Sequence, residues 1–203
     1  MKKAKAAKGP AKRRCPDVNH SMATSRPIVP TLHREMARAG LFAPGGRNLD
    51  LGGGKYDKAT RFVESFGARN LVVDPSRGEP HNRSVWAEVR RDKVDTVTVA
   101  NVLNVICSSR DRQSLIRAAA FSVRKGGRVG FQVYVGDGSG VGRVTKDGWQ
   151  ENRRPGSYMV EISRWFDWVE RRGNIVYALD PRRSPRGPVP PDGPYVSRRS
   201  GAR

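Results

Sequence analysis

The chain has 203 residues, of which 39 are Lys or Arg and 19 are Asp or Glu, so its formal net charge is +20. This length allows one α/β domain with a core of its own. Two cysteines and three scattered histidines form neither a disulfide framework nor a zinc motif, and no bound metal is expected. No apolar run approaches the ~20 residues of a membrane helix. We expect a cytoplasmic protein without a membrane partner.

The positive charge is concentrated at the two ends of the chain. Residues 1–14 contain seven Lys or Arg and no acid, and residues 181–203 contain six Arg and one Asp. Both ends lack periodic apolar residues and cannot bury enough surface to offset the entropy of ordering. We predict a basic, disordered arm over residues 1–30, one domain over 31–180 and a second disordered arm over 181–203. Such arms favour nucleic acid as the partner, although a role in solubility or targeting, or no specific role, fits them too.

Strand and helix patterns alternate through the predicted domain. This alternation predicts a mostly parallel sheet between two layers of helices, and the link between the last two strands is short enough only for an antiparallel hairpin. Trp165 and Trp168 beside this hairpin have the spacing of residues that pack in or near the core. The segment 136–156 shows no pattern and predicts a long irregular loop. The expected strands are 47–51, 70–74, 94–100, 128–135, 167–171 and 174–179. The expected helices are 31–39, 111–123, and those around Phe62–Phe66, Val85–Val89 and Met159–Phe166.

A glycine turn follows the first predicted strand. Asp50 lies just before Gly52–Gly54, and Asp74 closes the next strand 22 residues after Gly52. Such a turn lets a ligand approach backbone N–H groups, and an acid ending the second strand can accept hydrogen bonds from ribose hydroxyls. A dinucleotide site would have a glycine where this chain has Asp57, and Asp50 would repel a pyrophosphate. The acid suits the sulfonium and ammonium groups of S-adenosylmethionine, while a tight turn without a ligand is the plainer alternative.

With these motifs the chain resembles class I S-adenosylmethionine-dependent methyltransferases over about residues 31–180. The resemblance rests on DLGGG at 50–54, VVD at 72–74, VDTVTVANVLNV at 94–105 and KGGRVGFQVY at 125–134. VANVLNVI and GVGRVTKDGWQENR are similar to segments of small phage and mobile-element methyltransferase-like proteins, which would place the protein in the cytoplasm of a bacterial host. The resemblance implies a Rossmann-like three-layer α/β/α fold with S-adenosylmethionine as cofactor. Only residues 75–93 separate the second and next strands, so the third strand of that fold is expected to be reduced or missing.

The resemblance also implies roles for single residues. Asn101 and Asn104, at the end of the strand 94–100, are the candidate catalytic residues because a substrate amine or hydroxyl would be held there. The intervening sequence lacks the prolines and aromatic residue of adenine and cytosine amino-methyltransferases, and a turn cap is an equally good interpretation of Asn104. The residues expected to contact the cofactor are Asp50, Gly52, Gly53 and Gly54 at its methionine end, Asp74 at its ribose, Asn82 near its adenine and Asn101 near its sulfonium.

The segment 136–156 supplies the candidate substrate-binding residues. An aromatic side chain among bases and amides suits stacking on a nucleobase while a phosphate is held, although Trp149 could instead pack the loop onto the sheet. These residues are Lys146, Trp149, Gln150, Asn152 and Arg153. We expect a methyltransferase acting on DNA or RNA. The alternatives are a protein or small-molecule methyltransferase and a catalytically silent cofactor-binding or nucleic-acid-binding protein, and the sequence carries no signal for an oligomeric state.

Overall fold

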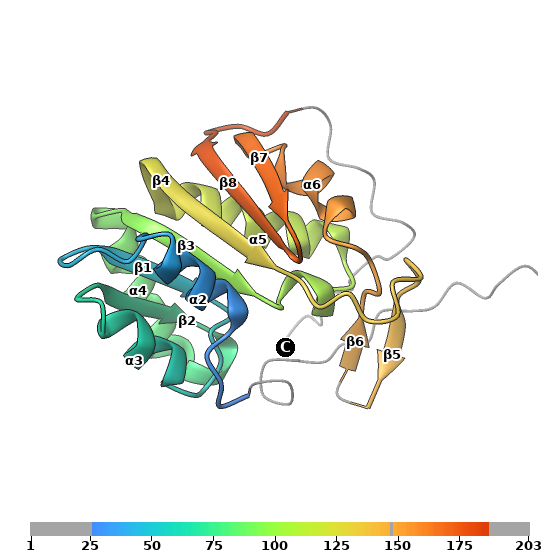
Figure 1. The fold of residues 1–203 in the computed structure, drawn as a ribbon, viewed down its shortest axis with the longest axis horizontal. Helices are drawn as coiled ribbons and strands as arrows, with labels where there is room; N and C mark the ends of the chain where they lie inside the picture. The colour runs from blue at the N-terminus through green and yellow to red at the C-terminus, as the bar shows by residue number, and fades with distance from the viewer. Residues whose placement is uncertain (1–25, 147, 187–203) are drawn as a thin grey trace, which may run out of the picture.

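A six-stranded sheet in the order β2-β1-β3-β4-β8-β7 forms the centre of the molecule (Figure 1). The computed structural model describes residues 26–146 and 148–186. β2, β1, β3 and β4 are parallel, and β8 runs antiparallel to both of its neighbours. The predicted C-terminal antiparallel hairpin is therefore confirmed. The strands are β1 (Arg47–Leu51), β2 (Arg69–Val73), β3 (Val94–Ala100), β4 (Val123–Gln132), β7 (Phe166–Arg172) and β8 (Ile175–Pro181).

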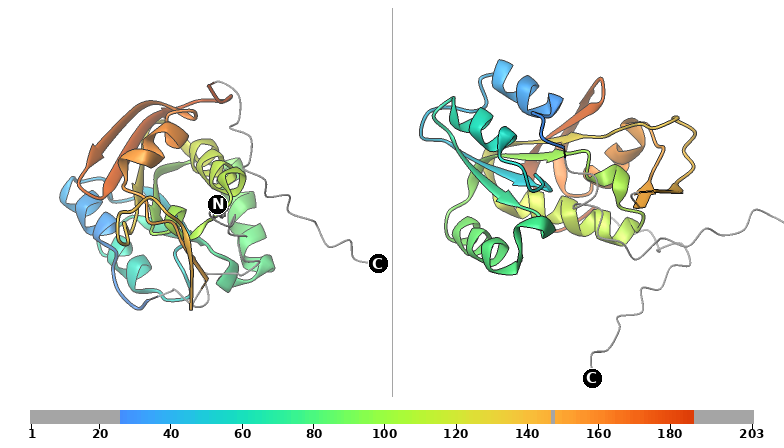
Figure 2. Two further views of the ribbon diagram at one scale, coloured as in Figure 1. Left: turned by 90° about the vertical axis from the view of Figure 1, so that its right-hand side faces the viewer. Right: turned by 90° about the horizontal axis from the view of Figure 1, so that it is seen from below.

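Helices cover both faces of the sheet (Figure 2). One face carries α2 (Thr31–Arg38) and α3 (Lys58–Glu64), and the other carries α4 (Glu79–Arg91) and α5 (Ser109–Ser122). The short helix α6 (Gly156–Ile162) contacts α5 and the β7–β8 hairpin. The predicted Rossmann-like three-layer α/β/α fold is confirmed. α4 leads from β2 to β3 with no strand between them, so the missing third strand is confirmed as well.

Three predicted elements differ from the structure. The loop 136–156 is not irregular throughout, because it contains the antiparallel pair β5 (Arg143–Thr145) and β6 (Gly148–Gln150), whose strands are too short to give a sequence pattern. The predicted helix around Met159–Phe166 ends at Ile162, and Phe166 instead opens β7. Both Ile162 and Phe166 enter the same core, which explains their misleading spacing. β4 begins at Val123, before a register shift against β3, and ends at Gln132.

The two faces of the sheet have different chemistry because side chains alternate along each strand. On the side of α4 and α5, strand residues such as Leu49, Val97 and Phe131 are buried in the main apolar core. On the side of α2 and α3, Asn48 and its neighbours are polar and also buried. This polar set is Asn48, Asp50, Asn70, Thr96 and Thr98. A smaller apolar cluster, built around α2 and α3, completes that side.

The described residues include only the inner ends of the two predicted arms. Most of both arms, residues 1–25 and 187–203, lies outside the described residues. The backbone N–H groups of Arg182 and Arg186 donate to the carbonyls of Trp165 and Arg164, so the chain stays attached to the start of β7 as far as Arg186. Of the two tryptophans predicted to pack in or near the core, Trp165 is buried and Trp168 is 41% exposed. In the described part of the chain, none of the helices has the length and apolar character needed to cross a bilayer.

Replacing Phe131 by Ala tests the main core. Phe131 is fully buried and its ring packs edge-on against Phe166 at a centroid distance of 6.3 Å. We expect Phe131→Ala to lower the free energy of unfolding by about 3–5 kcal/mol. Val160→Ala, at a position that is 72% exposed, is the control and should change it by less than about 0.5 kcal/mol. Equal losses in urea unfolding would contradict this assignment of the core.

Candidate functional site

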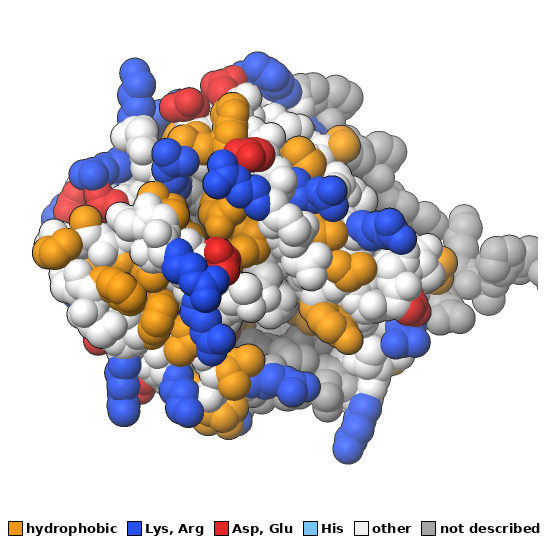
Figure 3. Space-filling model, in the orientation of Figure 1, with side chains coloured by type: hydrophobic (Ala, Val, Ile, Leu, Met, Phe, Trp, Pro, Cys, Tyr) orange, Lys and Arg blue, Asp and Glu red, His pale blue; other side chains and the backbone are white. Residues whose placement is uncertain are grey.

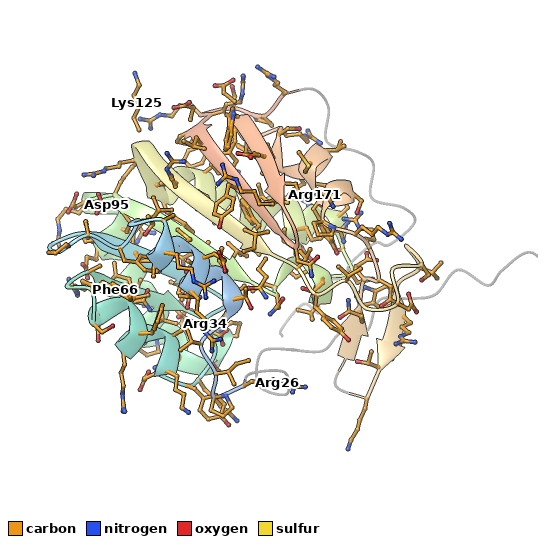
Figure 4. All side chains as sticks on the ribbon, viewed as in Figure 1. Arg26, Arg34, Phe66, Asp95, Lys125 and Arg171 are labelled. Carbon is orange, nitrogen blue, oxygen red and sulfur yellow. The ribbon has the colours of Figure 1, made fainter. Side chains whose placement is uncertain are left out.

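The glycine turn lies where the sheet topology opens a crevice. The chain leaves β1 toward β2 on one side and then crosses to β3 on the other, so the loops after β1 and β3 diverge at the carboxyl edge. Figure 4 shows Asp95 and Lys125, near the starts of β3 and β4, at the opposite edge from the β5–β6 hairpin. The residues predicted to bind the cofactor therefore follow strands that end at the same edge of the sheet.

Gly52 is required in this turn for two separate reasons. Its φ is +79°, in the left-handed region that favours glycine, and its N–H donates to the carbonyl of Val73 at 2.8 Å. A methyl group on Gly52 would lie 2.4 Å from a Cγ of Val102, which follows β3. The turn after β1 thus passes against the loop after β3.

Asp50 lies directly beneath the glycine turn and is 1% exposed. Its Oδ1 accepts a hydrogen bond from the Thr98 hydroxyl at 3.1 Å, and its Oδ2 is 3.1 Å from Nε2 of His33. Because a carboxylate only accepts, Nε2 carries the proton in this contact. A methyl group on Gly53 would lie 2.7 Å from Oδ2, so the glycine keeps the turn in contact with the carboxylate. The arrangement places a buried carboxylate below the backbone of the glycine turn.

Asp74 ties the glycine turn to the segment after β2. Its Oδ2 accepts from the N–H of Gly54 at 2.9 Å, and its Oδ1 accepts from the N–H and hydroxyl of Ser76. The side-chain amide of Asn82 bonds both backbone groups of Asp74, at 3.1 and 2.9 Å. Asp74 is 1% exposed, so its carboxylate fixes the turn from within. The ribose contact of Asp74 and the adenine contact of Asn82 stay predictions.

Asn101 is the exposed polar residue at the carboxyl end of β3. Its N–H donates to the carbonyl of Gln132 at 2.8 Å, which continues the ladder between β3 and β4. Its φ is +59°, an uncommon conformation for a residue with a side chain, although Asn tolerates it better than most. Its side-chain amide makes no hydrogen bond to another described residue. Strained residues with free polar groups are concentrated at binding sites, so Asn101 remains a candidate substrate contact.

Asn104 and Gln150, predicted to contact substrate, instead form a clamp with the backbone of Tyr134. Asn104 Oδ1 accepts from the Tyr134 N–H at 3.2 Å, and Gln150 Nε2 donates to the Tyr134 carbonyl at 3.1 Å. The two amides also bond to each other at 3.3 Å. Both side chains are buried, at 2% and 8% exposure. Asn104 thus holds backbone 30 residues away and does not cap the short helix Leu103–Val105 in which it lies, and its catalytic role stays a prediction.

Three of the other predicted substrate residues hold the loop in place. Trp149 is 6% exposed, and its ring occupies the space where Gly142 lacks a side chain. Asn152 is 1% exposed and donates to the carbonyl of Val141 at 3.0 Å. Arg153 binds Glu161 at 2.6 Å. Trp149 thus packs against Gly142 within its own loop, and Lys146 alone of the five predicted residues is exposed.

A buried ion cluster, which the sequence did not indicate, anchors this loop to the helices. The Arg112 guanidinium donates to both carboxylate oxygens of Glu161, at 2.9 and 3.1 Å, and to Glu151 at 3.2 Å. Burial raises the pKa of Glu151; the positive charges of Arg112 and Arg153 oppose this shift, and the charge of Glu161 adds to it. The partners lie 39 and 49 residues from Arg112, beyond the reach of any local pattern.

No family model and no curated protein matches this sequence. The chain is similar to several solved structures. The sugar N-methyltransferase KedS8 from Streptoalloteichus sp. ATCC 53650 superposes with a TM-score of 0.49 at 12% identity, over 90% of this chain and 100% of that one. DhpI in complex with SAH gives 0.47 at 20% identity, over 74% and 84%. The S-adenosylmethionine-dependent methyltransferase SibL gives 0.47 at 19% identity over 70% of this chain, which spans about half, 52%, of SibL.

Gly52→Ala tests the double constraint on the turn. Gly40 has a similar φ of +68° but open space around it, so Gly40→Ala introduces the backbone strain alone, worth about 1–2 kcal/mol. We expect Gly52→Ala to lower the free energy of unfolding by a further 1–3 kcal/mol, roughly, because its methyl group would overlap Val102. The excess should shrink in a Val102→Ala background. Equal losses of unfolding free energy for the two variants would show that the contact with Val102 does not affect stability.

Glu151→Gln tests the electrostatics of the ion cluster. The folded state raises the pKa of Glu151 above its ordinary 4.5, so it binds this proton more tightly than the unfolded state does. Wild-type stability relative to Glu151→Gln should therefore fall as pH rises from about 4.5 through the raised pKa. Urea unfolding across this range measures the difference.

Glu170, on β7, is the matched control for this experiment. A hydrogen bond from Arg172 lowers the pKa of Glu170, so stability should change with pH in the opposite direction. Wild-type stability relative to Glu170→Gln should rise with pH, from the lowered pKa up to about 4.5. Parallel slopes for the two variants would contradict the assigned direction at Glu151.

Proposed function

We propose that the protein is an S-adenosylmethionine-dependent methyltransferase that acts on nucleic acid. One observation carries the proposal. At the point where the strand order reverses, a buried carboxylate (Asp50) lies under a glycine turn (Gly52–Gly54), and an exposed amide (Asn101) ends the adjacent strand. Ligands of open α/β sheets bind in this crevice.

The residues of the turn fit the methionine end of this cofactor. The negative charge of Asp50 attracts an ammonium or sulfonium group and disfavours a pyrophosphate. Gly52 and Gly54 have positive φ values that favour glycine, so the turn carries no side chains over Asp50, and Asp74 holds the Gly54 N–H in place. When bound, S-adenosylmethionine supplies an electrophilic methyl group. Asp50 and the three glycines would hold its cationic end.

In this proposal, Asn101 orients the acceptor. Methyl transfer depends chiefly on aligning a nucleophile that has a free lone pair. The side-chain oxygen of Asn101 can accept a hydrogen bond from an acceptor amine or hydroxyl, which would fix the direction of that lone pair. The left-handed backbone of Asn101 and its ladder bond to Gln132 hold the residue in this position.

The charge of the protein supports a nucleic acid as the acceptor. Bases outnumber acids by 39 to 19, and Figure 3 shows Lys and Arg side chains at many places on one face, with Asp and Glu side chains at fewer. Lys146 and Arg154, in the segment between β4 and α6, are exposed and have no ion pair among the described residues. Phosphate binding by such groups weakens steeply with added salt.

Asp50→Asn tests the cofactor site with little change in shape. Wild-type protein should bind S-adenosylmethionine in titration calorimetry, and Asp50→Asn should bind it about 10- to 100-fold more weakly, since the neutral amide removes the negative charge that attracts the cationic end of the cofactor. Asp167→Asn, at an exposed acid on β7, is the control and should bind as wild type does. No binding by the wild type, or equal binding by both variants, would refute the assignment.

The acceptor is tested by incubating the protein with radiolabelled S-adenosylmethionine and, separately, with DNA, RNA and protein extracts. Label should enter a nucleic acid fraction, and increasing salt should reduce its incorporation. Label confined to protein would leave methyl transfer standing and refute the nucleic acid acceptor.

A further inference from the structure

The clamp formed by Asn104 and Gln150 holds the backbone of Tyr134. One amide accepts from its N–H, the other donates to its carbonyl, and the two amides close the ring by bonding to each other. Asn104 also accepts a bond at its backbone carbonyl from the N–H of Glu151, at 2.6 Å. Buried side-chain networks that are fully satisfied make the backbone they hold rigid. Tyr134 is therefore fixed in position although it lies beyond the last residue of β4.

The Tyr134 side chain is 62% exposed, in contrast to the clamp that holds it. Tyr rings usually bury most of their apolar surface. A rigid backbone that presents an exposed ring is pre-organised for contact, because little conformational freedom remains to be lost on binding.

Tyr134 lies at the acceptor side of the crevice. β4 ends at Gln132, whose carbonyl accepts from the N–H of Asn101, and Tyr134 follows two residues later. The ends of β3 and β4 are adjacent, so Asn101 and Tyr134 follow neighbouring strands at the same edge. The predicted stacking residue, Trp149, is buried at 6% exposure and cannot take this role without unpacking the loop.

We infer that the ring of Tyr134 is the surface on which the acceptor nucleobase stacks, with Asn104 and Gln150 as its positioning residues. The inference rests on the proposed function and names the part of the acceptor that is recognised. An aromatic face accepts any base, so the contact recognises a base as such, without reading its identity. The neighbouring Asn101 would then contact the polar edge of the stacked base.

Short single-stranded oligonucleotides with and without an abasic site test this stacking. Fluorescence anisotropy should show that wild-type protein prefers the strand with all its bases by about 5- to 100-fold, the range typical of one base–aromatic contact. Tyr134→Ala should abolish this preference, whereas Tyr134→Phe should retain it. Gln150→Ala, which removes half of the clamp, should reduce the preference. Trp168→Ala is the control for loss of an exposed aromatic ring elsewhere, and it should behave as wild type does.

Cofactor binding separates failure of this inference from failure of the proposed function. Tyr134→Ala should bind S-adenosylmethionine as tightly as wild type in calorimetry. If wild type binds the cofactor and nucleic acid, but does not distinguish the two strands, or if Tyr134→Ala still distinguishes them, the stacking role is refuted and the proposed function stands. If wild type binds neither cofactor nor nucleic acid, both fail together.

Discussion

The buried carboxylate of Asp50 is the constraint around which one side of the molecule is organised. Because Asp50 is only 1% exposed, its carboxylate requires hydrogen-bond partners inside the protein, and Thr98 and His33 provide them. The hydroxyl of Thr98 also accepts from Asn48, whose amide donates to Asn70, so the polar network spans β3, β1 and β2. This network explains why the α2–α3 side of the sheet holds only a small apolar cluster. The larger core on the opposite face supplies the stability that this polar layer does not.

The same carboxylate determines which backbone can lie above it. Gly53 approaches Asp50 so closely that a methyl group would overlap it, and Gly52 is limited in the same way by Val102. The turn cannot relax away from these contacts, because the Gly54 N–H is bound to Asp74. Two carboxylates therefore act on one turn from different sides. One places charge beneath it, and the other fixes its position relative to β2.

Local patterns were enough to predict the sheet, the glycine turn and the missing third strand. The alternation of strand and helix patterns, the spacing from Gly52 to Asp74 and the short link 75–93 are all properties of contiguous sequence, and the family resemblance indicated which strand that link leaves out. The clamp on Tyr134 could not be predicted in this way, because it joins residues that are 30, 46 and 16 positions apart. The sequence correctly indicated that Asn104 and Gln150 lie near the carboxyl edge. Whether an amide points into a crevice or into the protein depends on tertiary contacts that residue types do not encode.

This distinction changes how mutations at the site must be interpreted. Asn104 and Asp74 are polar residues of the type found in active sites, and removing either would impair any activity that depends on the loops they fix. Such a loss would not identify a group that touches substrate, because a buried amide or carboxylate left without its partner destabilises the loop itself. Asn101 and Tyr134 differ from them because their side chains are exposed and support no other part of the described structure through hydrogen bonds. Effects on binding without effects on stability are therefore expected at these two positions, and that combination separates recognition of the acceptor from support of the fold.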